Sequence, residues 1–233
     1  MKDEEFLEQI KKAFYTYLET GSRSNEKLKV LHGAIAKDIQ NKLGEWYKIH
    51  SLNFECGKEK EMNGRYTDKR VDIGIEKDGE IIAGIALKFI MRNYKQNSIN
   101  YFENMLGETA NIRSKGKPYF HIVIIPSRVP YFDKDKVIKN MEEINEENLK
   151  KYIKLSNDSI SKNMHTPNKT LIYLVDITPE PDKFNDFEKY KEFYKKNKET
   201  VKFNKSKASF EFGDNVIYND YEEFIKEIIK ELK

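Results

Sequence analysis

The sequence predicts an α/β (α+β) fold in which a mixed central sheet is flanked by helices. Three observations predict it. Residues 119–126 and 170–177 are nearly continuous apolar runs, which are typical of central strands covered on both faces. Residues 70–89 have the pattern of two strands joined by a tight turn, which predicts an antiparallel hairpin. Apolar residues recur at helical spacing before, between and after these strands, so we expect helices on both faces of the sheet.

Length and composition limit the class of protein. A chain of 233 residues suits one domain, with a core over 1–133 and a C-terminal part of the same domain over 134–233. The 42 basic and 39 acidic residues leave a net charge of only +3, so nucleic-acid binding would rest on local clusters of charge. The single cysteine, Cys56, excludes an internal disulfide and a multi-cysteine zinc site. No apolar run has the length of a membrane span and the N-terminal segment is acidic, so we expect a cytoplasmic protein without membrane contact.

The N-terminal quarter is expected to hold two helices and one strand. Residues 3–19 place apolar side chains at helical spacing. A second helix is expected after Asn25, a candidate cap, and its end is expected near Gly44. Residues 46–54 are expected to form the first strand or an extended segment, and the charge-dense residues 58–69 an exposed loop.

The turn of the hairpin decides which side chains meet. A two-residue turn at 78–79 pairs position 72 with position 85, whereas a three-residue loop at 77–79 pairs position 72 with position 84. The second register is preferred because it gathers the polar groups and keeps the aliphatic face intact. A glycine on the polar face would leave room above the sheet. That face would carry Asp72, Gly84, Ala86 and Lys88.

The rest of the chain is expected to alternate helices and strands. After a polar connection, a helix over 99–113 is expected to start at Ser98 as its cap. His121, in the first apolar run, is expected to be a hydrogen-bonded core residue. The further elements expected are a loop over 127–133, helices over 134–142 and 146–161, an end to the second apolar strand at Pro179 and Pro181, a helix over 184–199 beginning at Phe184, a hairpin over 201–218 turning at 213–215, and a last helix over 221–232.

An Asp at a strand end, a hairpin and a second strand that ends with Lys resemble the PD-(D/E)xK nuclease superfamily. Asp72 matches the first acid and Lys88 the lysine, whereas Ala86 stands where the second acid is expected. The resemblance covers residues 70–89, with Val71 in place of the proline. It implies a restriction-endonuclease-like fold and a Mg²⁺-dependent type II restriction endonuclease that acts as a homodimer on double-stranded DNA.

The resemblance also implies roles for these residues. Asp72, the acid at position 86 and the backbone carbonyl of Leu87 would hold Mg²⁺, and Lys88 would lie beside the attacking water. Ala86 has three explanations: an inactivating replacement of the acid, transfer of the acid to another element, or a native protein that binds without cleaving. The rival function is therefore a non-catalytic DNA- or protein-binding module. The candidates for an additional acid are Asp38, Glu45, Glu103 and Glu108.

Basic and amide side chains near the predicted site are candidates for contacts with DNA. Some interleave with tyrosine just before Asp72, and others follow the hairpin or lie on the helix after it. A solvated loop or an ordinary amphipathic helix would explain the same residues. The candidates are Arg65, Tyr66, Lys69, Arg70, Arg92, Asn93, Lys95, Gln96, Asn97, Asn100 and Arg128.

Overall fold

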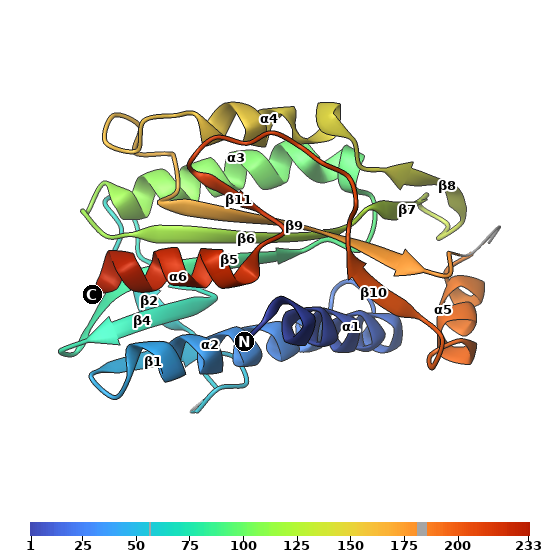
Figure 1. The fold of residues 1–233 in the computed structure, drawn as a ribbon, viewed down its shortest axis with the longest axis horizontal. Helices are drawn as coiled ribbons and strands as arrows, with labels where there is room; N and C mark the ends of the chain where they lie inside the picture. The colour runs from blue at the N-terminus through green and yellow to red at the C-terminus, as the bar shows by residue number, and fades with distance from the viewer. Residues whose placement is uncertain (56, 181–185) are drawn as a thin grey trace.

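A mixed seven-stranded sheet forms the centre of the molecule (Figure 1). The computed structural model describes residues 1–55, 57–180 and 186–233, so Cys56, Pro181 and Phe184 lie outside the described residues. The first three strands in the sheet are antiparallel and the next two are parallel to the third. The predicted mixed α/β architecture is therefore observed, and one sheet joins the two parts of the chain. In spatial order the strands are β1 (Tyr47–Ser51), β4 (Ile73–Lys77), β5 (Glu80–Phe89), β6 (Tyr119–Pro126), β9 (Lys169–Thr178) and β10 (Lys202–Lys205), and β11 (Val216–Tyr218) also pairs with β9.

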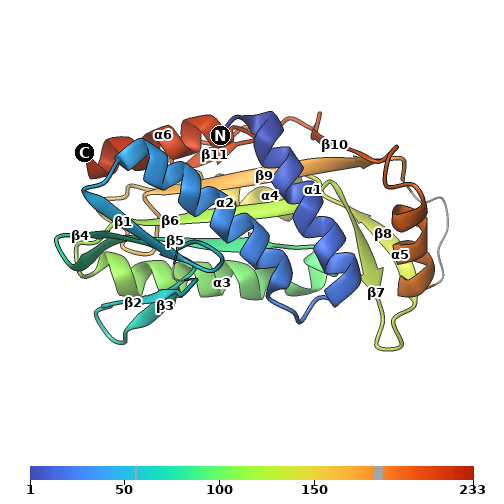
Figure 2. The ribbon, with the colours of Figure 1, turned by 90° about the horizontal axis from the view of Figure 1, so that it is seen from below.

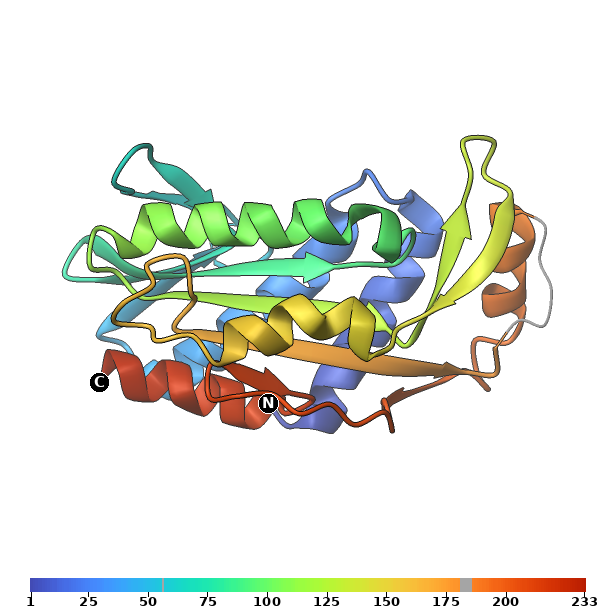
Figure 3. The same cartoon turned by 90° about the horizontal axis from the view of Figure 1, so that it is seen from above.

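Helices cover both faces of this sheet. Helices α1 (Asp3–Thr20), α2 (Glu26–Leu43) and α6 (Tyr221–Leu232) pack on one face, where their apolar side chains form one cluster with those of the strands (Figure 2). Helices α3 (Tyr94–Arg113) and α4 (Glu146–Ser156) cover the other face (Figure 3). Every residue of β6 is buried, which is the burial expected of a strand covered on both sides. Helix α5 (Phe187–Lys196) lies at one end of the sheet.

Two small hairpins lie outside the main sheet. One consists of β2 (Lys60–Met62) and β3 (Lys69–Val71), and the other of β7 (Arg128–Phe132) and β8 (Ile138–Glu143). Both project toward the same side of the molecule (Figure 3). The expected loop over 58–69 thus contains β2 and the first residue of β3, and this strand pair contacts β5.

The loop over 127–133 and the helix over 134–142 were wrong predictions, because these residues form β7 and β8. The carboxylate of Asp133 accepts the backbone amides of Asp135 and Val137 and so fixes the turn between the two strands. Val129 and Phe132 are buried on this hairpin. Burial of these side chains favours strand β7 where a loop was expected, and β8 pairs with β7 in place of the expected helix.

Three further predictions need correction. The hairpin over 201–218 is wrong: β10 runs antiparallel and β11 parallel to β9, so the two strands never pair with each other. Helix α3 starts at Tyr94, and the Ser98 hydroxyl bonds to the carbonyl of Lys95 inside the helix. Helix α4 ends at Ser156 and is shorter than expected. In the described part of the chain, no helix is both long enough and apolar enough to cross a membrane.

Candidate metal centre

Asp72 lies at a bend between β3 and β4. Val71 packs in an apolar cluster on the α3 side of the sheet, whereas Ile73 belongs to the core under α1 and α2. The predicted regular alternation of these residues is therefore interrupted at Asp72. The Asp72 carboxylate accepts the backbone amide of Leu87 at 2.7 Å, and its backbone carbonyl accepts the Ser51 hydroxyl at 2.8 Å. These two bonds fix Asp72 at the edge of β5, where β4 has not yet begun to pair.

The register of the hairpin differs from both predicted registers. The turn has two residues, with Lys77 opposite Glu80, but the pairing shifts by one position between Ile75 and Glu76. A bulge of this kind inserts one extra residue into one strand. Ile73 consequently pairs with Ile85, which brings position 72 level with position 86.

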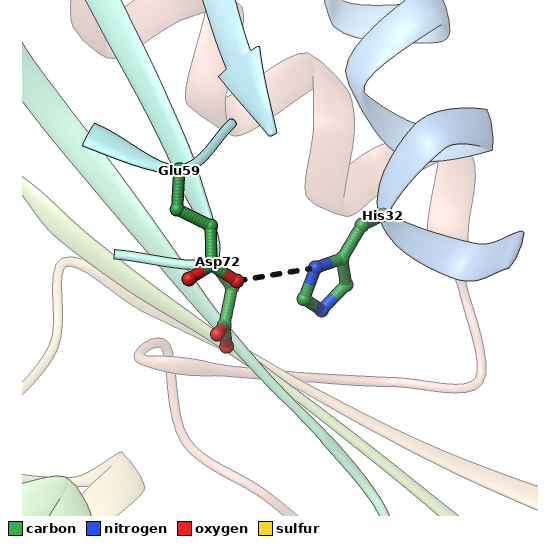
Figure 4. A group of neighbouring side chains, drawn as sticks. All are labelled: His32, Glu59 and Asp72. Atoms are coloured by element: carbon green, nitrogen blue, oxygen red, sulfur yellow. Dashed lines mark ion pairs between the residues drawn. The ribbon is translucent and has the colours of Figure 1, made fainter. Parts of the chain in front are cut away.

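Three potential metal ligands meet at this edge: His32, Glu59 and Asp72. One ligand atom from each lies within 4.8 Å of the others (Figure 4). His32 comes from α2, Glu59 directly precedes β2, and Asp72 directly precedes β4. The Nδ1 atom of His32 is 3.9 Å from Oε1 of Glu59. Figure 4 shows the imidazole ring beside the two carboxylates.

The electrostatics of this group fit a divalent cation. His32 is fully buried, and neither ring nitrogen has a hydrogen-bond partner among the described residues. Burial lowers the pKa of His32, an effect that Asp72 opposes, and so favours the neutral ring that can bind metal. Burial and the charge of Asp72 raise the pKa of Glu59. A cation between the three side chains would offset the repulsion of the two carboxylates and satisfy the imidazole.

The face that carries Gly84 and Ala86 is packed. A Cβ atom on Gly84 would lie 2.8 Å from a ring carbon of Tyr119 and 3.0 Å from the sulfur of Met62. Ala86 is 3 % exposed and belongs to the same apolar cluster. The room expected above Gly84 is thus filled, because β2 lies over β5, and an acid at position 86 would enter an apolar environment.

Lys88 is half-buried, and its charge contributes to lowering the pKa of His121 on the neighbouring strand. His121 is buried, and its Nε2 atom lies 3.0 Å from the hydroxyl of Thr109, so it is the hydrogen-bonded core residue that was expected. Burial, followed by the charges of Lys88 and Lys69, lowers the pKa of His121 to about 3. The His121 ring therefore stays neutral near pH 7.

This depressed pKa makes stability depend on pH. Below its ordinary pKa of 6.5, His121 takes up a proton only in the unfolded chain, so stability falls as the pH falls toward 3. Relative to His121→Phe, the wild type is expected to lose about 1.4 kcal/mol of unfolding free energy per pH unit between pH 6 and 4. Urea denaturation at several pH values measures this slope. A second non-titrating variant, His121→Gln, should give the same difference, and parallel curves for all three proteins would contradict the assignment.

The other predicted acids lie away from this group. The Asp38 carboxylate accepts the Tyr221 hydroxyl at 3.0 Å and pairs with the terminal amine of Met1. Glu45 and Glu103 are exposed. Glu108 forms an ion pair with Lys69 at 2.7 Å. Within the described part of the chain, none of the four belongs to the cluster of potential ligands around Asp72.

Sequence reasoning missed His32 and Glu59. His32 lies on a helix of ordinary amphipathic pattern, and Glu59 lies in a segment where nearly every second residue is charged. No spacing relates the two residues to each other or to Asp72. The only pattern in the sequence that pointed to Glu59 was the position of the charge-dense segment directly before the hairpin. This pattern does not distinguish Glu59 from the other acidic residues of the segment.

The predicted DNA-contact residues fall into four groups. Asn93 has a structural role, since its side chain accepts the amide and donates to the carbonyl of Phe132. Arg128 and Lys69 are engaged in ion pairs with Glu180 and Glu108, and Arg92, Gln96 and Asn97 line a cavity. The remaining five are exposed: Arg65, Tyr66, Arg70, Lys95 and Asn100.

Comparisons with family models, with curated proteins and with solved structures find no match to this chain.

Proposed function

We propose that this chain is a metal-dependent DNA endonuclease of the PD-(D/E)xK type, and more specifically a type II restriction endonuclease. One observation carries the proposal. A ring nitrogen of the buried His32, which has no hydrogen-bond partner among the described residues, lies beside the carboxylates of Glu59 and Asp72, at the hairpin that resembles the nuclease site. A buried, unsatisfied imidazole next to two carboxylates is costly unless a cation completes the group.

The order of the elements supports the proposal. Helix α2 is followed by the antiparallel strands β1, β4 and β5, by the crossover helix α3, and by β6 parallel to β5. This arrangement corresponds to the core that the resemblance implies, with antiparallel strands that carry the site, then a crossover helix and further strands. A homodimer, with one site for each strand of a duplex, belongs to the same proposal.

Each residue has a role in phosphodiester hydrolysis. Asp72, Glu59 and His32 would hold the cation, and Glu59 would supply the negative charge that position 86 lacks. The N–H and C=O of a strand residue point to the same side, so the Leu87 carbonyl faces the edge where its amide meets Asp72. A bound divalent cation would polarise the phosphate and acidify a water molecule. Lys88 would supply positive charge for the developing phosphorane.

The identity of the cation follows from the donor set. The resemblance implies Mg²⁺, which prefers oxygen ligands. The imidazole of His32 is a donor that suits Mn²⁺ and the later transition metals as well. Mn²⁺ is therefore expected to bind this site more tightly than Mg²⁺ does.

Cleavage of duplex DNA tests the proposal. The wild type is expected to produce discrete fragments with Mg²⁺ or Mn²⁺ and none with EDTA. Glu59→Gln and Lys88→Ala should each lower the rate by about a hundredfold or more. Lys48→Ala, which removes an exposed lysine from β1, is the matched control and should cleave normally. Metal-independent cleavage, or normal rates in both site variants, would contradict the proposal.

A non-catalytic DNA- or protein-binding module is the second candidate. The burial of Ala86 among apolar side chains favours it, since the expected second acid is absent and has no open space at its position. Such a module would bind its partner without a divalent cation and would tolerate Glu59→Gln. Retained binding with no cleavage under any metal condition would support this reading over the nuclease.

A further inference from the structure

A cavity of about 320 Å³ lies just beyond the end of β5. Ser22, in the connection between α1 and α2, and Lys27, at the start of α2, form one wall. Arg92, just before α3, and Gln96 and Asn97, in its first turn, form another. The described residues that line it include no Asp and no Glu. The cavity is therefore polar and basic, without a carboxylate in its wall.

Two cations meet at this cavity. Lys27 is only 7 % exposed, and its ammonium donates to the carbonyls of Ser22 at 2.8 Å and Ser24 at 2.5 Å. Its third N–H has no hydrogen-bond partner among the described residues. Arg92 forms no ion pair with any carboxylate in the part of the chain that the structure describes. Burial, and then the nearby charge of Arg92, lower the pKa of Lys27. Two like charges held together at a cavity favour an anion.

The carboxylate that lines the adjoining cavity, Asp133, is already engaged. Arg92 also lines a neighbouring cavity of about 470 Å³, to which Asp133 contributes. Asp133 pairs with Lys139 at 3.0 Å and accepts the amides of Asp135 and Val137. Its charge therefore fixes the turn between β7 and β8 and is not directed at Arg92.

We infer that the cavity between Lys27 and Arg92 binds a phosphate group, and that this group belongs to the nucleic-acid strand that is held at the metal centre. The inference rests on the proposed function. Arginine and lysine are the side chains that bind phosphate most readily, the former through its planar fork of donors. The side-chain amide nitrogen of Gln96 adds a further donor, since the oxygen of the same amide already accepts from Asn93.

The position of the cavity fits a second phosphate of the same strand. Lys27 precedes His32 by five residues on α2, roughly 7.5 Å along the helix axis. Met91, also in the cavity wall, lies two residues beyond the end of β5. It follows Leu87 by four residues, a separation of at most roughly 13 Å along an extended chain. Both separations are short enough for the cavity and the metal centre to hold nearby phosphates of one DNA strand. The β2–β3 and β7–β8 hairpins project on either side of the α1–α2 connection (Figure 3).

Equilibrium binding without cleavage tests this inference. A labelled 20-base-pair duplex is titrated in EDTA at several KCl concentrations. Arg92→Gln is expected to weaken binding about tenfold at 100 mM salt and to reduce the slope of log K against log salt by about one. Arg92→Lys should restore part of the affinity. Lys115→Gln removes an exposed charge at the far end of α3 and should change the affinity less than about twofold.

The remaining arms identify the source of the phosphate. Inorganic phosphate and a nucleoside monophosphate are tested separately for thermal stabilisation of the wild type and of Arg92→Gln. A loss of DNA affinity in Arg92→Gln supports the strand phosphate. Stabilisation by the small anions alone, dependent on Arg92, supports an anion site but assigns it to a free ligand and contradicts the strand phosphate. Equal behaviour of Arg92→Gln and the wild type in every arm overturns the inference.

The two proposals fail separately. DNA binding that depends on Arg92, together with an absence of cleavage under all metal conditions, would retain the phosphate site and remove the nuclease. Metal-dependent cleavage with wild-type affinity and rate in Arg92→Gln would retain the nuclease and remove the phosphate site.

Discussion

Asp72→Asn is expected to abolish the stabilisation of this protein by divalent cations, while the cation-free variant remains at least as stable as the wild type. The amide oxygen of Asn can still accept the Leu87 amide that Asp72 binds at 2.7 Å. The replacement also removes the charge that contributes to the raised pKa of Glu59. The replacement therefore removes a ligand of the cation without removing a contact of the folded chain. We expect the stabilisation by the cation to be lost, and the stability without the cation to be unchanged or higher.

Thermal and urea denaturation with and without Mn²⁺ measure this pair of effects. At a hundredfold excess over its dissociation constant, the cation should stabilise the wild type by about 2.7 kcal/mol. The same addition should leave Asp72→Asn almost unchanged, and DNA cleavage by this variant should fall about a hundredfold or more. Asp78→Asn, in the exposed turn of the same hairpin, removes an equal charge and serves as control.

Two outcomes would argue against the metal centre. An unaltered cation response in Asp72→Asn would show that the cation binds elsewhere. A large loss of stability in the cation-free variant would show that the Asp72 carboxylate is primarily a structural group. His32→Gln should reproduce the loss of the cation response, which distinguishes the three-residue site from a site made by Asp72 alone.

Ala86→Glu is expected to destabilise the protein by about 3–5 kcal/mol at neutral pH, since it places an unpaired charge in an apolar cluster. Met62 and Tyr119 already fill the space over the adjacent Gly84. A buried carboxyl has a raised pKa, so its cost should grow as the pH rises and shrink toward pH 5. No gain of cleavage is expected, because Glu59 already provides the second carboxylate beside Asp72.

Ala86→Met is the matched control for this prediction. Methionine adds a similar volume without a charge, and overpacking alone costs about 1–3 kcal/mol. The difference between the two variants in urea denaturation at pH 7 and pH 5 isolates the effect of the charge. An Ala86→Glu variant that is as stable as the wild type, and that cleaves DNA faster with a divalent cation, would return the second acid to position 86.

Local patterns in the sequence determined most of the secondary structure. The last helix has the bounds that its apolar periodicity predicted, because its own residues define the buried face. The first of the buried strands has the bounds of its continuous apolar run, because it is covered on both faces. The hairpin at 70–89 was also predicted, but the preferred three-residue loop was wrong, because Asp78 and Gly79 form a two-residue turn with positive φ at both positions. The regions that failed, 127–142 and 201–218, have weak periodicity, and there the burial of a few side chains against distant elements selected the strands.

The sequence alone also identified Asp72 and Lys88 as the residues around which chemistry would be sought. Only the tertiary structure decided what accompanies them. The bulge in the hairpin sets position 72 level with position 86, and the β2–β3 pair closes the face above Gly84. Glu59 directly precedes the same strand pair, and the packing of α2 against the sheet brings His32 close to Glu59 and Asp72. No local period connects residues 32, 59 and 72, so long-range packing, and not backbone propensity, assembles the candidate site.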